Sequence, residues 1–129
     1  MKNQITEESI IAKYKENKQK NESELSELES KKKGYEEAES IFMEAEKQHS
    51  DYINTFREEY AGTDELIRLN QFDENIYEEE EKIKKLLARE KEALEAEEKR
   101  LYAQQEEIEK QYRMELSAFK EKEKEKGET

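Results

Sequence analysis

The sequence predicts an all-α protein, a long antiparallel hairpin of two coiled-coil-like helices. Three observations favour this fold. Ala, Glu, Lys, Arg and Leu make up 75 of the 129 residues, a composition typical of long helices and coiled coils. Apolar residues recur in steps of three and four over most of the chain. The chain has no proline and three glycines, and only Gly62 lies near the midpoint, where a hairpin has to turn.

The composition also limits what the protein can be. With 32% hydrophobic residues, a thick core is out of reach, and only a narrow apolar seam between helices can form. The absence of cysteine excludes disulfides, thiolate nucleophiles and cysteine-based metal sites. A net charge of −12 disfavours nucleic acid and anionic membrane as partners. We find no apolar run near 18 residues and no signal-peptide pattern, so we expect a cytoplasmic protein without membrane insertion.

The first arm of the hairpin is expected over about residues 5–60. It carries two interleaved lines of mostly apolar residues with coiled-coil spacing, which predict the seam that faces the second arm. The first line comprises Tyr14, Asn21, Leu28, Tyr35, Phe42, His49 and Phe56, and the second comprises Ala38, Ala45 and Tyr52, with Ile41, Ile53 and Tyr60 alongside.

Gly34 is the one position in the first arm that could end a helix, because it follows three lysines. The seven-residue repeat keeps its phase through this glycine, which a true break would have no reason to do. We therefore expect one continuous helix, weakened by about 1 kcal/mol at Gly34.

The turn is expected at about residues 61–64. Gly62 can adopt the left-handed conformation that ends a helix, and Thr63 or Asp64 can cap the helix that follows. Asn70 and Asp73 offer a second cap. A longer turn reaching residue 73, with a short helix over residues 64–69, is therefore the alternative.

The second arm is expected over about residues 65–120, followed by a frayed tail at 121–129. Its seam is predicted from Leu69, Phe72, Ile76, Ile83, Leu116 and Phe119 together with a central stripe. The stripe carries one large apolar residue per heptad, and Glu90, Glu97 and Gln104 fill the alternate positions. Because this seam is thin, we expect a partner's helices to complete the stripe, which comprises Leu87, Leu94, Leu101, Ile108 and Tyr112.

Nothing in the sequence favours catalysis. The chain has one histidine and 36 carboxylates, but no phosphate loop, no nucleophile–base arrangement and no credible metal set, so we expect no enzyme, no metal and no cofactor. His49 is expected on the seam with its ring edge in water. A protonation switch that loosens the hairpin near pH 6 is the alternative.

The central Tyr60-Ala61-Gly62 resembles the Trp-x-Gly turn of the WXG family, small helical hairpins exported by type VII secretion. The chain departs from that family in having no tryptophan and longer arms. It is more similar to the small LXG-associated helical proteins (Lap-type targeting factors) of the type VIIb system of Gram-positive bacteria. That resemblance covers the whole chain as architecture, but its specific motif is three residues long.

The resemblance implies a non-enzymatic adaptor. Such proteins bind the helical N-terminal LXG domain of a secreted toxin in the cytoplasm, often beside a second small hairpin protein, and the secretion apparatus recognises the composite. Export of the protein with its partner, without a cleaved signal peptide, stays open.

The same family carries C-terminal export signals in which an acid follows an aromatic residue by four positions. Phe119 and Glu123 are the best-placed match, although this acidic chain repeats the spacing elsewhere, for example at Tyr102 and Glu106. The alternative is that Phe119 only closes the seam.

Two other functions stay open. One is a coiled-coil stalk of a rotary export ATPase, as in FliJ-like proteins, which often carry a basic surface that this chain lacks. The other is a structural homodimer in which two hairpins form a four-helix bundle. Stimulation of the ATPase would indicate the first, and a tight dimer that ignores any toxin domain would indicate the second.

Overall fold

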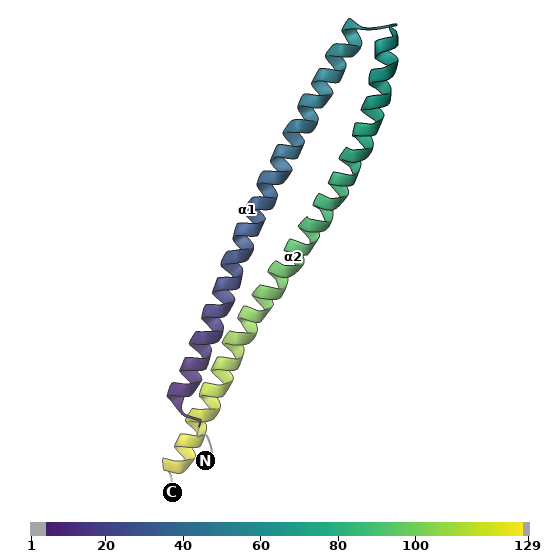
Figure 1. The fold of residues 1–129 in the computed structure, drawn as a ribbon. Coiled ribbons are helices and arrows are strands. Elements are labelled where there is room, and N and C mark those ends of the chain that lie inside the picture. Colours follow the sequence, from purple (N-terminus) through teal and green to yellow (C-terminus); the bar gives the residue numbers. More distant parts are fainter. Residues whose placement is uncertain (1–4, 128–129) are drawn as a thin grey trace. The chain divides into compact units, whose positions relative to one another are not determined.

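The computed structural model describes residues 5–127, which form two long helices joined by a short turn (Figure 1). Helix α1 spans Glu7–Glu59 and helix α2 spans Asp64–Gly127. The helices run antiparallel and pack against each other, which confirms the predicted all-α hairpin. Residues 1–4 and 128–129, which belong to the expected first arm and tail, lie outside the described residues.

A reciprocal cap starts α1 immediately after Thr6. The Thr6 hydroxyl accepts a hydrogen bond from the Ser9 backbone N–H at 3.0 Å, and the Ser9 hydroxyl accepts one from the Thr6 N–H at 3.0 Å. These two bonds satisfy backbone donors that the first helical turn leaves unpaired. Glu7 and Glu8 in the same turn add a favourable interaction with the helix dipole.

Helix α1 continues through Gly34, as the unbroken repeat predicted. Gly34 has helical backbone geometry, and its missing side chain faces open space, since no heavy atom lies within 4 Å of where a Cβ would stand. The glycine therefore lowers the stability of the helix without interrupting it.

The turn occupies residues 60–63 and is built around Gly62, whose φ of 78° lies in the left-handed region. The Thr63 backbone N–H and hydroxyl both donate to the Tyr60 carbonyl, at 3.2 and 2.6 Å. The Leu66 N–H in turn donates to the Thr63 hydroxyl at 3.4 Å, so Thr63 caps α2.

The longer turn with its own short helix is wrong, because α2 is unbroken from Asp64 onward. Asn70 and Asp73 do not cap a helix but tie α2 to α1. The Arg57 guanidinium donates to the Asn70 side-chain oxygen at 3.3 Å and to the Asp73 carboxylate at 3.0 Å.

The frayed tail is also corrected, since α2 continues through residues 121–127. Lys124 and Lys126 lie in the last turn, where positive charge interacts favourably with the helix dipole. Lysine and glutamate alternate through this segment, and both residues have high intrinsic helix propensity, which favours helix without any apolar face.

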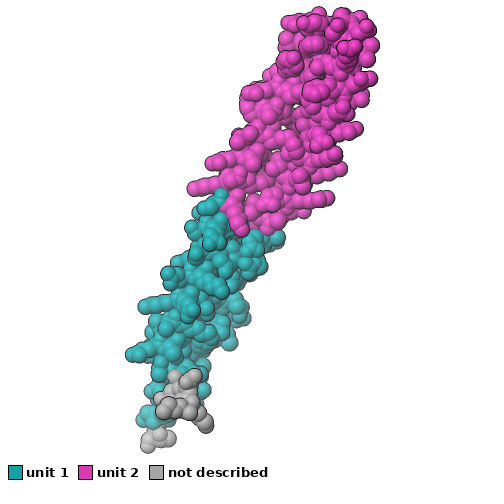
Figure 2. Space-filling model, in the orientation of Figure 1, with its two compact units in different colours: residues 1–30, 95–129 teal, residues 31–94 magenta. Residues whose placement is uncertain are grey.

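The chain divides into two compact units, each containing a segment of both helices (Figure 2). Unit 1 comprises the residues up to Ser30 and those from Glu95 onward, and unit 2 comprises Lys31–Leu94. Their seams, meaning the residues of each helix that face the other, differ in chemistry.

The seam of unit 1 is apolar around one buried amide. Ile10, Leu28 and Leu101 are buried, and Asn21 is 2% exposed. The Asn21 side-chain amide donates to the Leu101 carbonyl at 3.0 Å and to the Gln104 side-chain oxygen at 3.4 Å. These bonds compensate the burial of the amide and favour one alignment of the helices.

Two tyrosines close the seam of unit 1 further along. The rings of Tyr14 and Tyr112 stack with centroids 4.0 Å apart. The Tyr14 hydroxyl donates to the Glu109 carboxylate at 2.5 Å, and this hydrogen bond is the main cause that raises the pKa of Tyr14 above its usual 10.0.

The seam of unit 2 contains many charged residues. Ile53 is buried within it, and Phe42, Phe56, Leu69, Ile76 and Leu87 are half-buried. Charged and polar side chains occupy the positions between them at a similar depth. These half-buried polar residues include Glu39, Glu46, His49, Asp73, Glu80 and Glu81.

The first predicted seam line of α1 is confirmed, since all seven of its members are buried or half-buried. The second line, Ala38, Ala45 and Tyr52, is wrong. These residues are exposed, and the position after each of them faces α2 instead: Glu39, Glu46 and Ile53. Of the residues expected alongside this line, Ile53 is buried as predicted, whereas Ile41 and Tyr60 are exposed. An α-helix drifts by about 20° per heptad relative to a seven-residue repeat, so the inward face moves from one neighbouring line to the next along a helix of this length.

Candidate partner-binding site

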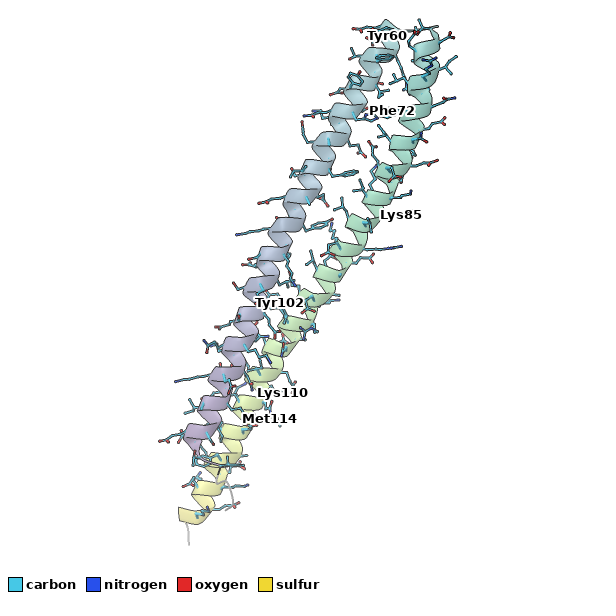
Figure 3. All side chains as sticks on the ribbon, in the orientation of Figure 1. Tyr60, Phe72, Lys85, Tyr102, Lys110 and Met114 are labelled. Carbon is cyan, nitrogen blue, oxygen red and sulfur yellow. The ribbon has the colours of Figure 1, made fainter. Side chains whose placement is uncertain are left out.

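The turn motif stacks its aromatic residue on α1. The rings of Tyr60 and Phe56 stack with centroids 4.2 Å apart, and Tyr52 lies 6.3 Å from Phe56, so three rings run along the end of α1. Tyr60 is 40% exposed (Figure 3), and its carbonyl receives both bonds from Thr63. In Tyr60-Ala61-Gly62, the glycine therefore makes the turn and the tyrosine packs against the helix that precedes it.

The predicted partner-binding stripe is covered within the hairpin. Leu101 is 1% exposed and Leu94 is 7% exposed, while Leu87, Ile108 and Tyr112 are half-buried. Asn21 bonds the Leu101 carbonyl, and Tyr14 stacks on Tyr112, so α1 already occupies the side that was expected to await foreign helices. A partner that used this stripe would first have to separate the two helices.

The candidate export signal lies on the last turns of α2. Phe119 is half-buried and Glu123 is exposed. Both line an open groove of about 770 Å³ in unit 1, together with Ile5 and Ile10 of the α1 end. Phe119 therefore closes the apolar seam of unit 1, as the structural alternative expected, and Glu123 is available at its edge.

The large apolar residues that are exposed gather in unit 2. Of twelve such residues among those described, nine belong to Lys31–Leu94. The apolar pattern of the sequence identified five of them but assigned them to the seam: three to that of the first arm and two to that of the second. The nine are Ile41, Met43, Tyr52, Tyr60, Ile67, Phe72, Tyr77, Ile83 and Leu86.

An ion pair crosses the seam of unit 2 beneath these side chains. The Lys84 ammonium lies 3.1 Å from Oε2 of Glu46, and this interaction with the Glu46 carboxylate is the main cause that raises the pKa of Lys84 above 10.5. This Glu46 oxygen is inaccessible to solvent and receives no well-aligned hydrogen bond. Only the positive charge of Lys84 compensates the burial of this oxygen. Because burying a charged pair costs desolvation free energy, this part of the seam contributes little to stability.

His49 belongs to a polar cluster near the turn. Its Nε2 lies 2.9 Å from one carboxylate oxygen of Asp73, and the Arg57 guanidinium donates to the other oxygen at 3.0 Å. The His49 side chain is 22% exposed, so it lies on the seam with its edge in water. The expected position is confirmed, and the alternative, a protonation switch, stays a prediction.

Within residues 5–127 there is no group of three or more His, Cys, Asp or Glu that could hold a metal ion. None of the helices in this range contains a segment both long and apolar enough to cross a membrane.

Comparisons with protein-family models, with curated proteins and with solved structures found no match to this chain. The resemblance to the LXG-associated proteins therefore stays a prediction from the turn motif and the architecture.

Proposed function

We propose that the protein is a non-enzymatic adaptor that binds the helical N-terminal LXG domain of a secreted toxin and prepares it for type VIIb export. Binding would take place in the cytoplasm, before the toxin leaves the cell. A second small hairpin protein would join the same complex.

The single observation that carries this proposal is the exposed apolar surface of unit 2. Monomeric soluble proteins rarely gather many large apolar side chains on one region of their surface unless another molecule covers them. Nine such residues lie on a hairpin segment whose own seam is rich in charged groups, and four of them, Ile41, Tyr52, Phe72 and Leu86, lie on one side of it. Two helices with this composition gain little from each other and would gain more from added helices.

The proposal differs in one respect from the expectation drawn from the sequence. The partner does not complete the stripe from Leu87 to Tyr112, most of which α1 covers. It packs on the outside of the hairpin instead. The resulting bundle keeps the hairpin intact, so that binding needs no unfolding step.

Co-expression with the LXG domain encoded nearby tests the function. We expect the two proteins to co-purify and to sediment as one species of fixed stoichiometry. Separate sedimentation at micromolar concentrations of both would refute the adaptor role. A homodimer that persists in the presence of the LXG domain would favour the four-helix bundle instead.

A further inference from the structure

Unit 2 exposes an apolar face to which both helices contribute. Residues of this face directly precede buried or half-buried residues, as Tyr52 precedes Ile53 and Phe72 precedes Asp73. Ile83 is the exception, since Lys84 after it is also exposed. One position along a helix is a rotation of about 100°. In an antiparallel pair of helices, the residues that directly precede seam residues therefore lie on the same side of both helices. The apolar face comprises Ile41, Ala45 and Tyr52 of α1 and Phe72, Ile83 and Leu86 of α2.

The contacts across the seam align the two halves of this face. The His49–Asp73 contact at 2.9 Å places Tyr52 near the level of Phe72. The Lys84–Glu46 ion pair at 3.1 Å places Ile41 near the level of Ile83. Ile41 is 71% exposed and Phe72 is 58% exposed, so the side chains of both helices are open to a third one.

A row of acidic residues borders the apolar face along α1. Glu44 and Asp51 directly precede Ala45 and Tyr52, and Glu37 lies one heptad earlier. All three acids are exposed, and unit 2 as a whole contains 18 acidic and 11 basic residues. A second copy of this chain would bring the same excess of negative charge to the face. Along α2, Lys82 and Lys85 directly precede Ile83 and Leu86, so the border of negative charge lies along the α1 edge, and it is this edge that favours basic residues of a partner.

We propose that the apolar face binds an amphipathic helix of another protein, in which lysine or arginine residues border an apolar stripe. The inference rests on the proposed function and adds to it the docking surface and the chemistry of the helix. Apolar residues of the incoming helix would pack between α1 and α2, over the small side chain of Ala45. Its basic residues would pair with Glu37, Glu44 and Asp51.

A synthetic helix of about four heptads, with leucine and alanine along one stripe and lysine beside it, is the probe. Fluorescence anisotropy of the labelled peptide measures its binding to the full-length protein. We expect the lysine peptide to bind and to weaken with added salt, while the same peptide with glutamate in place of lysine does not bind. Equal binding of both peptides, or binding of neither, would overturn the proposal.

Matched variants locate the site. Ile41→Ser, Phe72→Ser and Leu86→Ser together should weaken binding of the lysine peptide at least about tenfold. Met43→Ser with Tyr77→Ser is the control, because these exposed residues follow seam residues and lie on the opposite side of the hairpin. Circular dichroism verifies that both variants remain helical. Equal losses in the two would show that the face is not the site.

A second pair of variants tests the charge. Glu37→Lys, Glu44→Lys and Asp51→Lys together should weaken binding of the lysine peptide, whereas Glu16→Lys, Glu22→Lys and Glu29→Lys change net charge equally and should have a smaller effect. Equal effects would overturn the acidic border.

An LXG domain distinguishes the two proposals. If it binds the wild type and the triple serine variant equally well, the adaptor function stands and the apolar face is not its docking surface. If the lysine peptide binds the face and no LXG domain does, the face stands and the proposed function fails.

Discussion

Individual polar side chains on the seam determine how the two helices align. Tyr14 and Asn21 each bond to a group on α2, and both bonds lie in unit 1, where the apolar contacts are also strongest. In unit 2 the polar seam residues of α1 include His49 and Glu46, whose partners are the charged groups of Asp73 and Lys84. Substitution of single polar groups on the seam therefore measures what each one contributes.

Tyr14→Phe tests the hydrogen bond to Glu109. The pKa of Tyr14 is raised in the folded state, so the folded protein holds this proton more tightly than the unfolded chain does. Its contribution to stability is present below pH 10 and is lost as the pH rises through the raised pKa. We expect wild-type melting temperature to fall above about pH 10, and the fall to be shallower in Tyr14→Phe than in the control Tyr77→Phe. Parallel profiles would show that the bond does not form.

Asn21→Leu tests whether the buried amide specifies the alignment of the helices. A leucine at this position buries more apolar surface, so we expect the free energy of unfolding to rise by about 1 kcal/mol. The alignment and the number of chains in the assembly should become less uniform, as for other buried seam asparagines. Denaturant titration and sedimentation velocity measure the two effects, with exposed Asn54→Leu as control. A destabilised variant with a single sharp boundary would contradict this role.

Each helix is limited by local signals that the sequence already contains. The cap at Thr6 and Ser9 starts α1, Gly62 and Thr63 make the turn, and Gly34 leaves α1 uninterrupted because the repeat maintains its phase. The extent of α2 at its C-terminal end was not predicted. Lysine and glutamate both have high helix propensity, so a Lys/Glu segment can form helix without an apolar face, and a search for apolar periodicity misses this contribution.

The same substitution at two glycines should have opposite effects on stability. Gly62→Ala places a Cβ on a left-handed backbone and should destabilise the protein by about 1 kcal/mol. Gly34→Ala should stabilise it by about 0.5–1 kcal/mol, because the residue lies inside α1. Neither Cβ would meet a neighbouring atom within 4 Å, so backbone conformation alone determines whether each substitution raises or lowers stability. Thermal denaturation of both variants measures the difference, and equal signs would contradict the positions assigned to the two residues.

At the scale of the whole molecule, the fold could be predicted from the sequence and the binding surface could not. Periodicity identified the two helices and the seam line from Tyr14 to Phe56. It also identified the apolar line at Ala38, Ala45 and Tyr52, but placed it inside the hairpin. Apolar spacing cannot tell which of two adjacent lines a helix buries, because drift of the inward face depends on the partner helix. Only the paired helices of the structure show that Ala38, Ala45 and Tyr52 face outward.

The two units should differ in local stability for the same reason. Charged residues in the seam of unit 2 contribute less than the buried Ile10, Leu28 and Leu101 of unit 1. We expect backbone amides at residues 36–56 and 66–87 to exchange with deuterium faster than those at residues 10–28 and 98–112. Mass spectrometry after proteolysis measures both groups in one experiment. Slower exchange in unit 2 would show that its seam is the stronger one.

Hydrogen exchange in the presence of the LXG domain tests the central claim, that a foreign helix covers the outside of unit 2. The account predicts that added LXG domain slows exchange at residues 37–52 and 71–87, while the segment around Leu101 is already protected and changes little. Protection that appears only around residues 94–112, or no change anywhere when both proteins are in excess of micromolar concentration, would contradict it.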